Sequence, residues 1–419
     1  MKHLPYQAWF AALSLFLIPV FFTTGCQKDD VSQSQPDFLR ENIEWLAAGE
    51  REGRLAGTIH EADAANYIAD RFLQFGVIPA GDDETYFQEF LLSGPVVQAM
   101  SMENHISRNV VGMVRGSQNP EQFIILGAHY DSQGMGGVIS MNGSIEPSIH
   151  NGADDNASGT TGVLYLAKQL AENPAEKSIL LIAFSGEEMG LIGSRYFAEN
   201  MEMSRDSILA MINLDMIGRL VEQELTIFGT GTANIWSEIL ESVESDSLAI
   251  STVPSGTGSS DHAAFYEIGI PSLHYFTGIH EDYHRDTDIP EKINYDGMAA
   301  VLSHAEQTVR EISRYTPGGI EFTETTDPRE SVMQRDGVTL GVLPDYSYSG
   351  EGFRIEGIRE GQPADNAGIE EGDIIIRMGE NEVEDIYDYM ELLGEYRAGD
   401  SERLVIRRGE EEIELDVIF

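Results

Sequence analysis

The pattern that decides the fold is clearest in residues 123–131, which read FIILGAHYD. An apolar run typical of a buried strand leads there directly into His129 and Asp131. Comparable apolar runs recur along the chain, at residues 109–114, 178–184, 208–214, 225–228 and 270–275. Helical patterns precede or separate these runs, at residues 61–75, 157–171, 191–200, 233–243 and 297–314. Strands that alternate with helices predict an α/β fold with a mixed, largely parallel central sheet flanked by helices on both faces.

Side chains that can bind a metal follow the ends of these predicted strands. Five strand-end or loop segments each contain a carboxylate or an imidazole, at residues 129–131, 152–159, 185–188, 215 and 280–288. Taken singly, each has an ordinary explanation, such as a helix N-cap or a solvated loop. Because functional groups gather at the carboxyl ends of parallel strands, we expect these side chains to lie together. A shared divalent metal would remove the cost of burying carboxylates side by side.

The composition narrows the kind of partner and of metal site. Of 419 residues, 71 are acidic and 26 basic, which gives a formal net charge of -45. This balance argues against nucleic acid or an anionic membrane surface as a partner, since both require clustered Lys and Arg. The single cysteine excludes a disulfide framework and a zinc site built on Cys. Any metal must therefore be held by His, Asp and Glu.

The amino terminus resembles a bacterial lipoprotein signal. An apolar run at residues 8–22, too short for a comfortable membrane span, ends shortly before Cys26. We therefore expect residues 1–25 to be a signal peptide, Cys26 to be lipidated and residues 26–36 to be a tether. The protein would be exported and lipid-anchored to a bacterial envelope membrane, periplasmic or at the cell surface. The alternative is an ordinary export signal with an incidental cysteine.

Residues 53–314 resemble the secreted dizinc aminopeptidases of the leucyl aminopeptidase, aminopeptidase S and aminopeptidase Y type. The matching segments occur in the family's order and read AHYD (128–131), GADDNASG (152–159), FSGEE (184–188) and NLDMIG (213–218), followed by Tyr283-His284 with Asp288. The segment GSSDH (258–262) matches a family element that holds no ligand, and GRLAGT (53–58) matches another, whose ordinary interpretation is a structural turn. The zinc peptidase domain is expected at residues 37–316.

The resemblance implies two zinc ions bridged by the carboxylate of Asp155. The remaining ligands would be His129 and Asp215 for one ion, and Glu188 and His284 for the other. Glu187 would be the general base, Asp131 would orient His129, and Tyr283 would donate to the developing oxyanion, as in some members of the family. Of the two histidines in the last loop, the family's spacing favours His284 over His280. The peptide bond between Asp155 and Asn156 is expected to be cis.

The carboxy-terminal residues 333–419 resemble a PDZ domain of the kind associated with bacterial proteases. The resemblance depends on three segments, TLGV (339–342), GQPADNAGI (361–369) and GDII (372–375). It implies that Leu340, Gly341 and Val342 bind the carboxyl terminus of a peptide. The alternative is a packing domain with a closed groove. A polar stretch after Pro317-Gly318-Gly319 predicts a linker at residues 317–332.

These features favour a membrane-anchored exopeptidase that uses two zinc ions to remove amino-terminal residues from peptides. A carboxypeptidase-type relative would use the same ligands. A single-zinc glutaminyl cyclase on the same scaffold is another alternative, but it does not need the pair His129 and Asp215. A third possibility, from a different class, is an inactive hydrolase domain joined to a PDZ domain that binds peptides.

Overall fold

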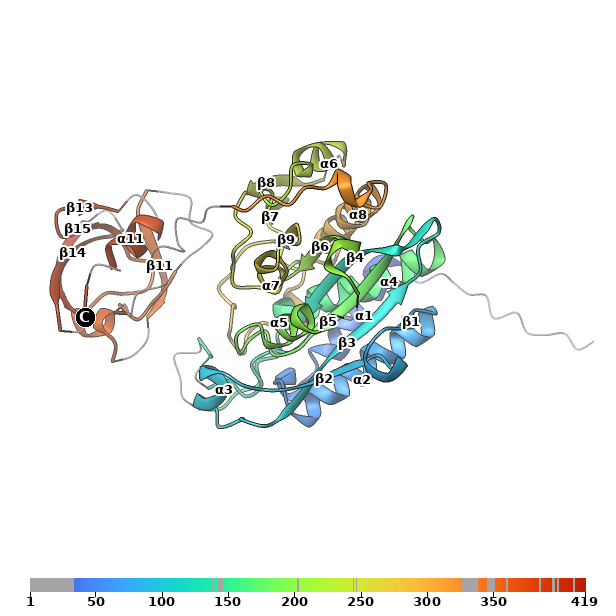
Figure 1. Cartoon of the computed structure of the whole chain (residues 1–419). Helices are drawn as coiled ribbons and strands as arrows, with labels where there is room; N and C mark the ends of the chain where they lie inside the picture. Colours follow the sequence, from blue (N-terminus) through green and yellow to red (C-terminus); the bar gives the residue numbers. More distant parts are fainter. Residues whose placement is uncertain are drawn as a thin grey trace, which may run out of the picture. The chain divides into compact units, whose positions relative to one another are not determined.

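The computed structural model describes residues 34–419, apart from 138, 142–145, 202, 244, 246, 326–337, 345–350, 359–360, 384–385, 394–395, 398 and 410 (Figure 1). The predicted signal peptide, Cys26 and nearly all of the predicted tether lie outside the described residues. Within the described ranges, no helix combines the length and the apolar character needed to cross a bilayer.

A nine-stranded sheet forms the centre of the amino-terminal part, in the order β1-β3-β5-β4-β6-β9-β7-β8, with β2 paired to β3. The strands are β1 (Ile78–Pro79), β2 (Phe87–Leu91), β3 (Ile106–Val114), β4 (Asn119–His129), β5 (Lys177–Phe184), β6 (Ile208–Leu214), β7 (Glu224–Phe228), β8 (Ala249–Val253) and β9 (Ser272–Phe276). The run β5-β4-β6-β9 is parallel throughout, whereas β1, β2 and β3 join it as an antiparallel edge. The predicted mixed sheet is confirmed, and its parallel strands lie at the centre.

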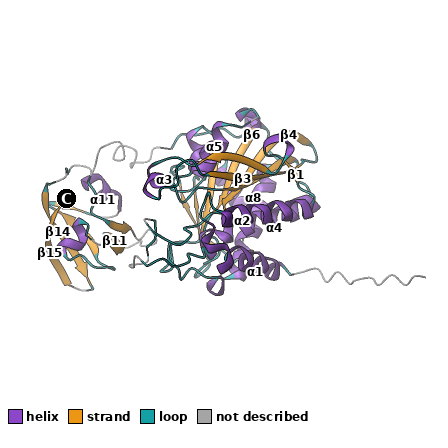
Figure 2. Cartoon of the chain, turned by 90° about the horizontal axis from the view of Figure 1, so that it is seen from below, coloured by secondary structure: helices purple, strands orange, loops and turns teal. Residues whose placement is uncertain are grey.

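Helices cover both faces of this sheet (Figure 1, Figure 2). One face carries α1 (Gln35–Leu46), α2 (Ile59–Phe75), α4 (Gly159–Glu172), α6 (Trp236–Ser242) and α8 (Tyr295–Ile312). The other carries α5 (Ile192–Glu199) and α7 (His262–Glu267). Strand β5 is buried at every residue because alternate side chains supply the two cores, Ile179 and Leu181 on one face, Leu180 and Ile182 on the other. A strand covered on both faces therefore reads as a continuous apolar run.

The short helix α3 (Pro95–Ala99) belongs to a smaller apolar cluster at one end of the sheet. Its Val97 packs there with Phe90, Leu92 and Met189. The sequence pattern predicts neither α3 nor α7, because five or six residues are too few to show a helical period.

The carboxy-terminal part is β-rich and has its own apolar core, which includes Leu340, Phe353 and Ile375. Its strands are β10 (Val342–Pro344), β11 (Phe353–Ile358), β12 (Ile374–Met378), β13 (Asn381–Glu382), β14 (Ser401–Arg408) and β15 (Glu411–Ile418), and its helices include α10 (Pro363–Ala367) and α11 (Ile386–Leu393). The predicted peptide-binding residues lie at its first strand. Leu340 is buried, and the amide of Gly341 donates to Thr339 Oγ1 at 3.0 Å. That amide already has a partner within its own loop.

The first part of the predicted linker is held against the amino-terminal part. Phe322 forms an antiparallel bridge with Ala233, and the backbone amide of Glu321 donates to Asn234 Oδ1 at 3.1 Å. Thr325 contacts the hydroxyl of Tyr266, which donates to the Thr325 carbonyl at 2.9 Å. The chain therefore stays packed on the sheet domain as far as Thr325.

Gly127 in the central strand β4 provides a test of this packing. A methyl group added at Gly127 would lie 2.4 Å from Phe184 Cε2 and 3.3 Å from Met211 Cε. Both neighbours belong to the buried core, so Gly127→Ala is expected to destabilise the fold by about 1–3 kcal/mol. Urea denaturation monitored by circular dichroism measures the change in the free energy of unfolding. Gly49→Ala is the matched control, because a methyl group there meets nothing within 4 Å. Equal stability of the two variants would contradict the packing described for β4.

Candidate active site

The predicted site residues lie at the carboxyl ends of three parallel strands in the centre of the sheet. His129 is the last residue of β4, Glu187 and Glu188 lie just after the end of β5, and Asp215 directly follows β6. Asp155 lies in the segment Ala153–Ser158 that leads into α4, at a point where the backbone is not helical (φ -107°, ψ 90°). His284 comes from the loop after β9.

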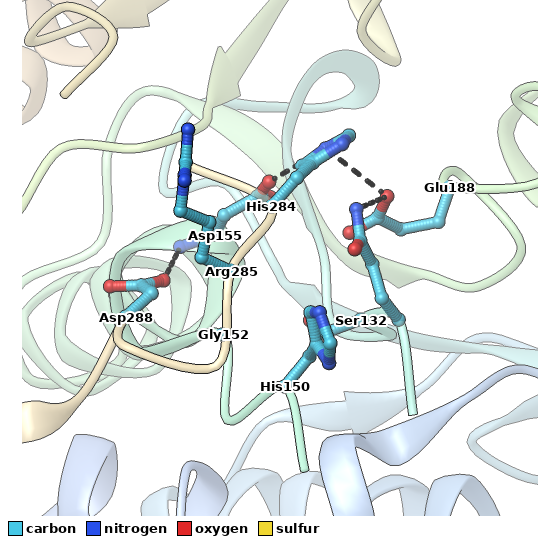
Figure 3. A pocket seen from close by; sticks show the side chains of 9 residues that line it. Ser132, His150, Gly152, Asp155, Glu188, His284, Arg285 and Asp288 are labelled. Atoms are coloured by element: carbon cyan, nitrogen blue, oxygen red, sulfur yellow. Dashed lines mark hydrogen bonds and ion pairs between the residues drawn. The ribbon is translucent and has the colours of Figure 1, made fainter. Parts of the chain in front are cut away.

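These residues form two groups of three that share Asp155. In the first, His129 Nε2 lies 3.4 Å from Asp155 Oδ1 and 3.3 Å from Asp215 Oδ1. In the second, His284 Nε2 lies 3.2 Å from Asp155 Oδ2 and 3.4 Å from Glu188 Oε2 (Figure 3). Each oxygen of the Asp155 carboxylate thus faces a different group. Within each group the candidate ligand atoms all lie within 4.8 Å of one another.

The spacing of these atoms fits a bound cation better than direct hydrogen bonds. A hydrogen bond between charged nitrogen and oxygen is typically about 2.7–2.9 Å long, shorter than the contacts found here. Two ligands that each lie about 2.1 Å from a tetrahedral zinc are about 3.4 Å apart. In addition, Asp215 Oδ1 and Glu188 Oε1 are buried and have no hydrogen-bond partner among the described residues. The donor set of carboxylate oxygens and imidazole nitrogens is one that zinc accepts.

Burial and neighbouring charges strongly perturb the pKa values of the carboxylates in the second group. Burial raises the pKa of Glu188 to about 8, although His284 opposes the shift. Burial also acts to raise the pKa of Asp155, but the neighbouring imidazoles of His129 and His284 hold it well below the usual value. A cation shared by these carboxylates would offset the cost of burying them together.

Glu187 lies beside the first group and outside both triads. Its Oε2 is 3.9 Å from His129 Nε2, and its side chain is 11% exposed. Burial raises its pKa well above the usual range; His129 opposes this shift, and the nearby Asp215 adds to it. Glu187 and Glu188, adjacent in sequence, therefore face different groups. A carboxyl group with a raised pKa next to candidate metal ligands is a candidate for proton transfer.

Asp131 connects β4 to the loop that carries Glu187. Its Oδ1 accepts a hydrogen bond from the backbone amide of Glu187 at 3.3 Å. The same oxygen is 3.8 Å from His129 Nδ1, whereas the backbone carbonyl of Asp131 is 3.2 Å from that nitrogen. The nearer partner of the imidazole is therefore the carbonyl, and the carboxylate holds the backbone of Glu187. Burial raises the pKa of Asp131 to about 6.

The two histidines of the last loop have different partners. His280 Nε2 lies 3.1 Å from Asp154 Oδ2 and belongs to neither triad. The ring of Tyr283 stacks on His284 with a centroid distance of 3.8 Å. Burial raises the pKa of Tyr283 well above its usual value, and nearby carboxylates such as Asp155 add to the shift, so the hydroxyl keeps its proton.

Asp288 supports Asp155, the residue that both groups share, through the backbone. Its carboxylate accepts hydrogen bonds from the amides of Asp154, at 2.9 and 3.0 Å, and of Asp155, at 3.0 Å. The peptide bond between Asp155 and Asn156 is cis, as the family resemblance implies. Asp288 belongs to a segment that matches the family, but the resemblance assigned no role to it.

Two polar side chains that the sequence analysis did not single out contact the carboxylates of the site. Ser260 Oγ donates to Asp215 Oδ2 at 2.7 Å, and Gln133 Nε2 donates to Glu188 Oε2 at 3.1 Å. Ser260 lies within the matching segment 258–262, which could have indicated it, whereas nothing in the pattern around Gln133 does. Gln133 also lines the hollow beside the second group, together with His150 and Arg285 (Figure 3).

A buried carboxyl group, Glu61 of α2, lies behind the strand ends. Its Oε1 accepts a hydrogen bond from the Tyr130 hydroxyl and lies 3.1 Å from Ser107 Oγ. The Ser107 hydroxyl is in turn 2.8 Å from Ser185 Oγ. Burial raises the pKa of Glu61 to about 7, although the hydrogen bond from Tyr130 opposes the shift. Glu61 thus contacts both β3 and the segment that follows β4.

Comparison with known proteins identifies the domains. The model of peptidase family M28 matches residues 109–309, and the model of the PDZ domain matches residues 319–419. The chain therefore combines an M28 peptidase domain with a carboxy-terminal PDZ domain.

Individual relatives share parts of the chain. Aminopeptidase YwaD of Bacillus subtilis is 31% identical over 213 residues, which are 46% of this chain and 42% of that protein. A probable zinc metalloprotease of Leptosphaeria maculans is 36% identical over 141 residues, 33% of this chain and 31% of that protein. The chain thus spans less than half the length of these curated relatives.

Solved structures share the fold at low sequence identity. BSAP, a zinc aminopeptidase from Bacillus subtilis, superposes with a TM-score of 0.54 at 19% identity, covering 68% of this chain and 98% of that chain. Glutaminyl cyclase of Porphyromonas gingivalis gives a TM-score of 0.54 at 18% identity, covering 67% of this chain and 99% of that chain. Two enzymes with different reactions therefore share this architecture.

The raised pKa of Glu61 predicts a pH dependence of stability. Its usual value is 4.5, and the folded value is about 7, so between these pH values the folded protein binds more protons than the unfolded chain. The free energy of unfolding should therefore fall by about 3 kcal/mol as the pH rises from 4.5 to 7 on account of this group. Glu61→Gln removes that contribution, so its pH profile should be flatter than that of the wild type.

Urea denaturation at several pH values measures both profiles. Asp70→Asn, a change at an exposed acid of the same helix, is the matched control and should leave the slope unchanged. Parallel profiles for the wild type and Glu61→Gln would contradict the buried, protonated state of Glu61.

Proposed function

We propose that the protein is a zinc exopeptidase that removes amino-terminal residues from peptides, with two zinc ions in its active site. The observation that supports this best is the pair of triads that share Asp155. His129, Asp155 and Asp215 would hold one ion, and Asp155, Glu188 and His284 the other. When bound, zinc would lower the pKa of a water molecule to about 7 and polarise the scissile carbonyl.

The residues around the triads would supply proton transfer. Glu187 would take a proton from the attacking water at Oε2 and pass it to the leaving amine. Its position supports this role, because Oε2 lies beside the first triad, 3.9 Å from His129 Nε2. The hydrogen bond from the Glu187 amide to Asp131 would keep the base in place relative to His129. The Tyr283 hydroxyl, which stays protonated, would donate to the developing oxyanion.

The completeness of the site favours hydrolysis over the alternatives. A glutaminyl cyclase with one zinc has no need of the pair His129 and Asp215, yet here that pair lies 3.3 Å apart in the first triad. An inactive peptide-binding protein has no need to keep five ligands and Glu187 together. A carboxypeptidase-type relative would use the same ligands and differ only in the groups that bind the substrate.

The remaining parts of the proposal concern partners and location. The PDZ domain would bind a peptide carboxyl terminus at Leu340, Gly341 and Val342, and the amide of Gly341 would have to exchange its bond to Thr339 for the ligand. Lipidation of Cys26 would tether the enzyme to a bacterial envelope membrane. The strong negative charge supports the absence of a nucleic-acid partner.

A substrate panel combined with zinc analysis tests the proposed function. We expect about two zinc ions per chain and release of leucine from leucine p-nitroanilide, with no activity once the amino group is blocked. Chelation should abolish the activity, and added zinc should restore it. Trimming of amino-blocked dipeptides from their carboxyl end would instead indicate a carboxypeptidase. One zinc ion with cyclisation of amino-terminal glutamine would indicate a cyclase, and no turnover of any substrate would indicate a binding protein.

Glu187→Gln tests the assignment of the base. The change removes the proton acceptor but leaves both triads intact, so turnover should fall by about 10²- to 10⁴-fold while the zinc content stays at the wild-type level. Initial rates and elemental analysis of the same preparation measure both quantities. Glu199→Gln, at the end of α5 and outside the site, should keep wild-type rates. Wild-type turnover of the Glu187 variant would rule out this base.

A further inference from the structure

Arg54 is a buried cation, and all of its side-chain hydrogen bonds go to neutral backbone carbonyls. Its side chain has no exposed surface. The guanidinium donates to four backbone carbonyls, those of Leu46 at 2.6 Å, Tyr130 at 2.8 Å, Asn151 at 2.8 Å and Gly152 at 3.0 Å. Among the described residues it forms no ion pair with a carboxylate within 4.0 Å. A buried arginine with this pattern needs an explanation, since charged side chains are rarely buried without a charged partner.

The four carbonyls belong to the segments that carry the proposed zinc ligands. Tyr130 stands between His129 and Asp131 in sequence. Asn151 and Gly152 lead directly into the segment Ala153–Ser158 that contains Asp155. The fourth carbonyl, from Leu46, lies at the end of α1. Arg54 therefore connects the strand that ends in one zinc ligand to the segment that bears the bridging ligand.

The backbone around Arg54 is built to bring its side chain to this position. Glu52, Gly53 and Arg54 have φ values of 39°, 67° and 48°, in the left-handed region. The carbonyl of Gly53 accepts a hydrogen bond from Gly134 at 3.1 Å. A methyl group added at Gly53 would lie 2.5 Å from the His150 carbonyl oxygen and 2.6 Å from that of Gly134. The turn is thus packed against backbone on both sides, and only glycine fits there.

The charge of Arg54 suits its surroundings. Burial lowers its pKa to about 10, and four carboxylates oppose this shift, those of Asp131, Asp288, Asp155 and Glu188. The guanidinium is therefore a cation at neutral pH. It interacts electrostatically with Asp155 and Glu188 of the triads but is not itself a member of either triad.

We infer that Arg54 is a positioning residue of the zinc site, which fixes the separation between the segment that bears His129 and the segment that bears Asp155. This inference rests on the proposed function, since it assumes that the triads bind zinc. A planar guanidinium suits the task because Nε, Nη1 and Nη2 reach carbonyls in different directions. A lysine keeps the charge but has its three donors on one nitrogen, so it cannot connect the same segments.

Arg54→Lys separates this role from the effect of charge. We expect zinc affinity to fall by at least about tenfold, and kcat at saturating zinc to fall while KM changes little. Competition with a fluorescent zinc chelator measures the affinity without any assay of activity. Arg310→Lys is the matched control, because Arg310 also donates to a backbone carbonyl, that of Asn173, but lies outside the site. It should bind zinc as the wild type does.

The outcomes distinguish this inference from the proposed function. If the wild type binds no zinc, the proposed function fails and this inference with it. If the wild type binds two zinc ions and Arg54→Lys binds them equally well, only this inference is overturned, even where the variant has a lower melting temperature. Should Arg54→Lys not fold, Arg54→Gln serves as the second variant, because it removes the buried charge and its single amide nitrogen can donate to at most two of the four carbonyls. Wild-type zinc affinity of folded Arg54→Gln would likewise overturn the inference.

Discussion

Three carboxylates and two imidazoles converge at the carboxyl ends of the central strands. The site depends on one constraint, the mutual repulsion of those carboxylates. Each oxygen of the Asp155 carboxylate lies 3.2–3.4 Å from the Nε2 atom of one histidine, Oδ1 from His129 and Oδ2 from His284. Each of these distances suits two ligands of the same cation. Without cations, burial of Glu188 and Asp155 together is costly, which the raised pKa of Glu188 reflects. The surrounding hydrogen bonds hold these groups in place. Asp288 accepts from the backbone amides of Asp154 and Asp155. Ser260 and Gln133 donate to the carboxylates of Asp215 and Glu188.

The register of the parallel strands explains why the groups meet. His129 pairs with Phe184 across β4 and β5, and Gly127 pairs with Asn213 across β4 and β6. The three strands therefore end almost level, and the residues that follow leave the sheet at the same edge. A shift of one strand by two residues would preserve the apolar pairing but move one of these side chains by about 7 Å, so the two triads could not form.

Much of this arrangement is readable in the sequence, because buried strands leave long apolar runs. The predicted run 208–214 coincides with β6, and the other predicted strands agree with observed ones to within a few residues. Strand β8 was not predicted, since its residues AISTV mix apolar and polar side chains and none of them is buried at the edge of the sheet. The residues that converge on Asp155 came from matching segments. Arg54 and Glu61 could not be given a role in this way, because their partners are backbone carbonyls and hydroxyls far away in sequence, which leave no periodic pattern.

The contacts that hold residues 321–325 against the sheet domain have a practical consequence for dividing the chain. Helix α8 ends at Ile312, which suggests a cut soon afterwards. Such a truncation would remove the bridge partner of Ala233 and leave the hydroxyl of Tyr266, a buried residue, without its acceptor. A soluble catalytic fragment, or a fusion in which another module replaces the PDZ domain, should therefore keep the chain through Thr325 and place its junction beyond that residue.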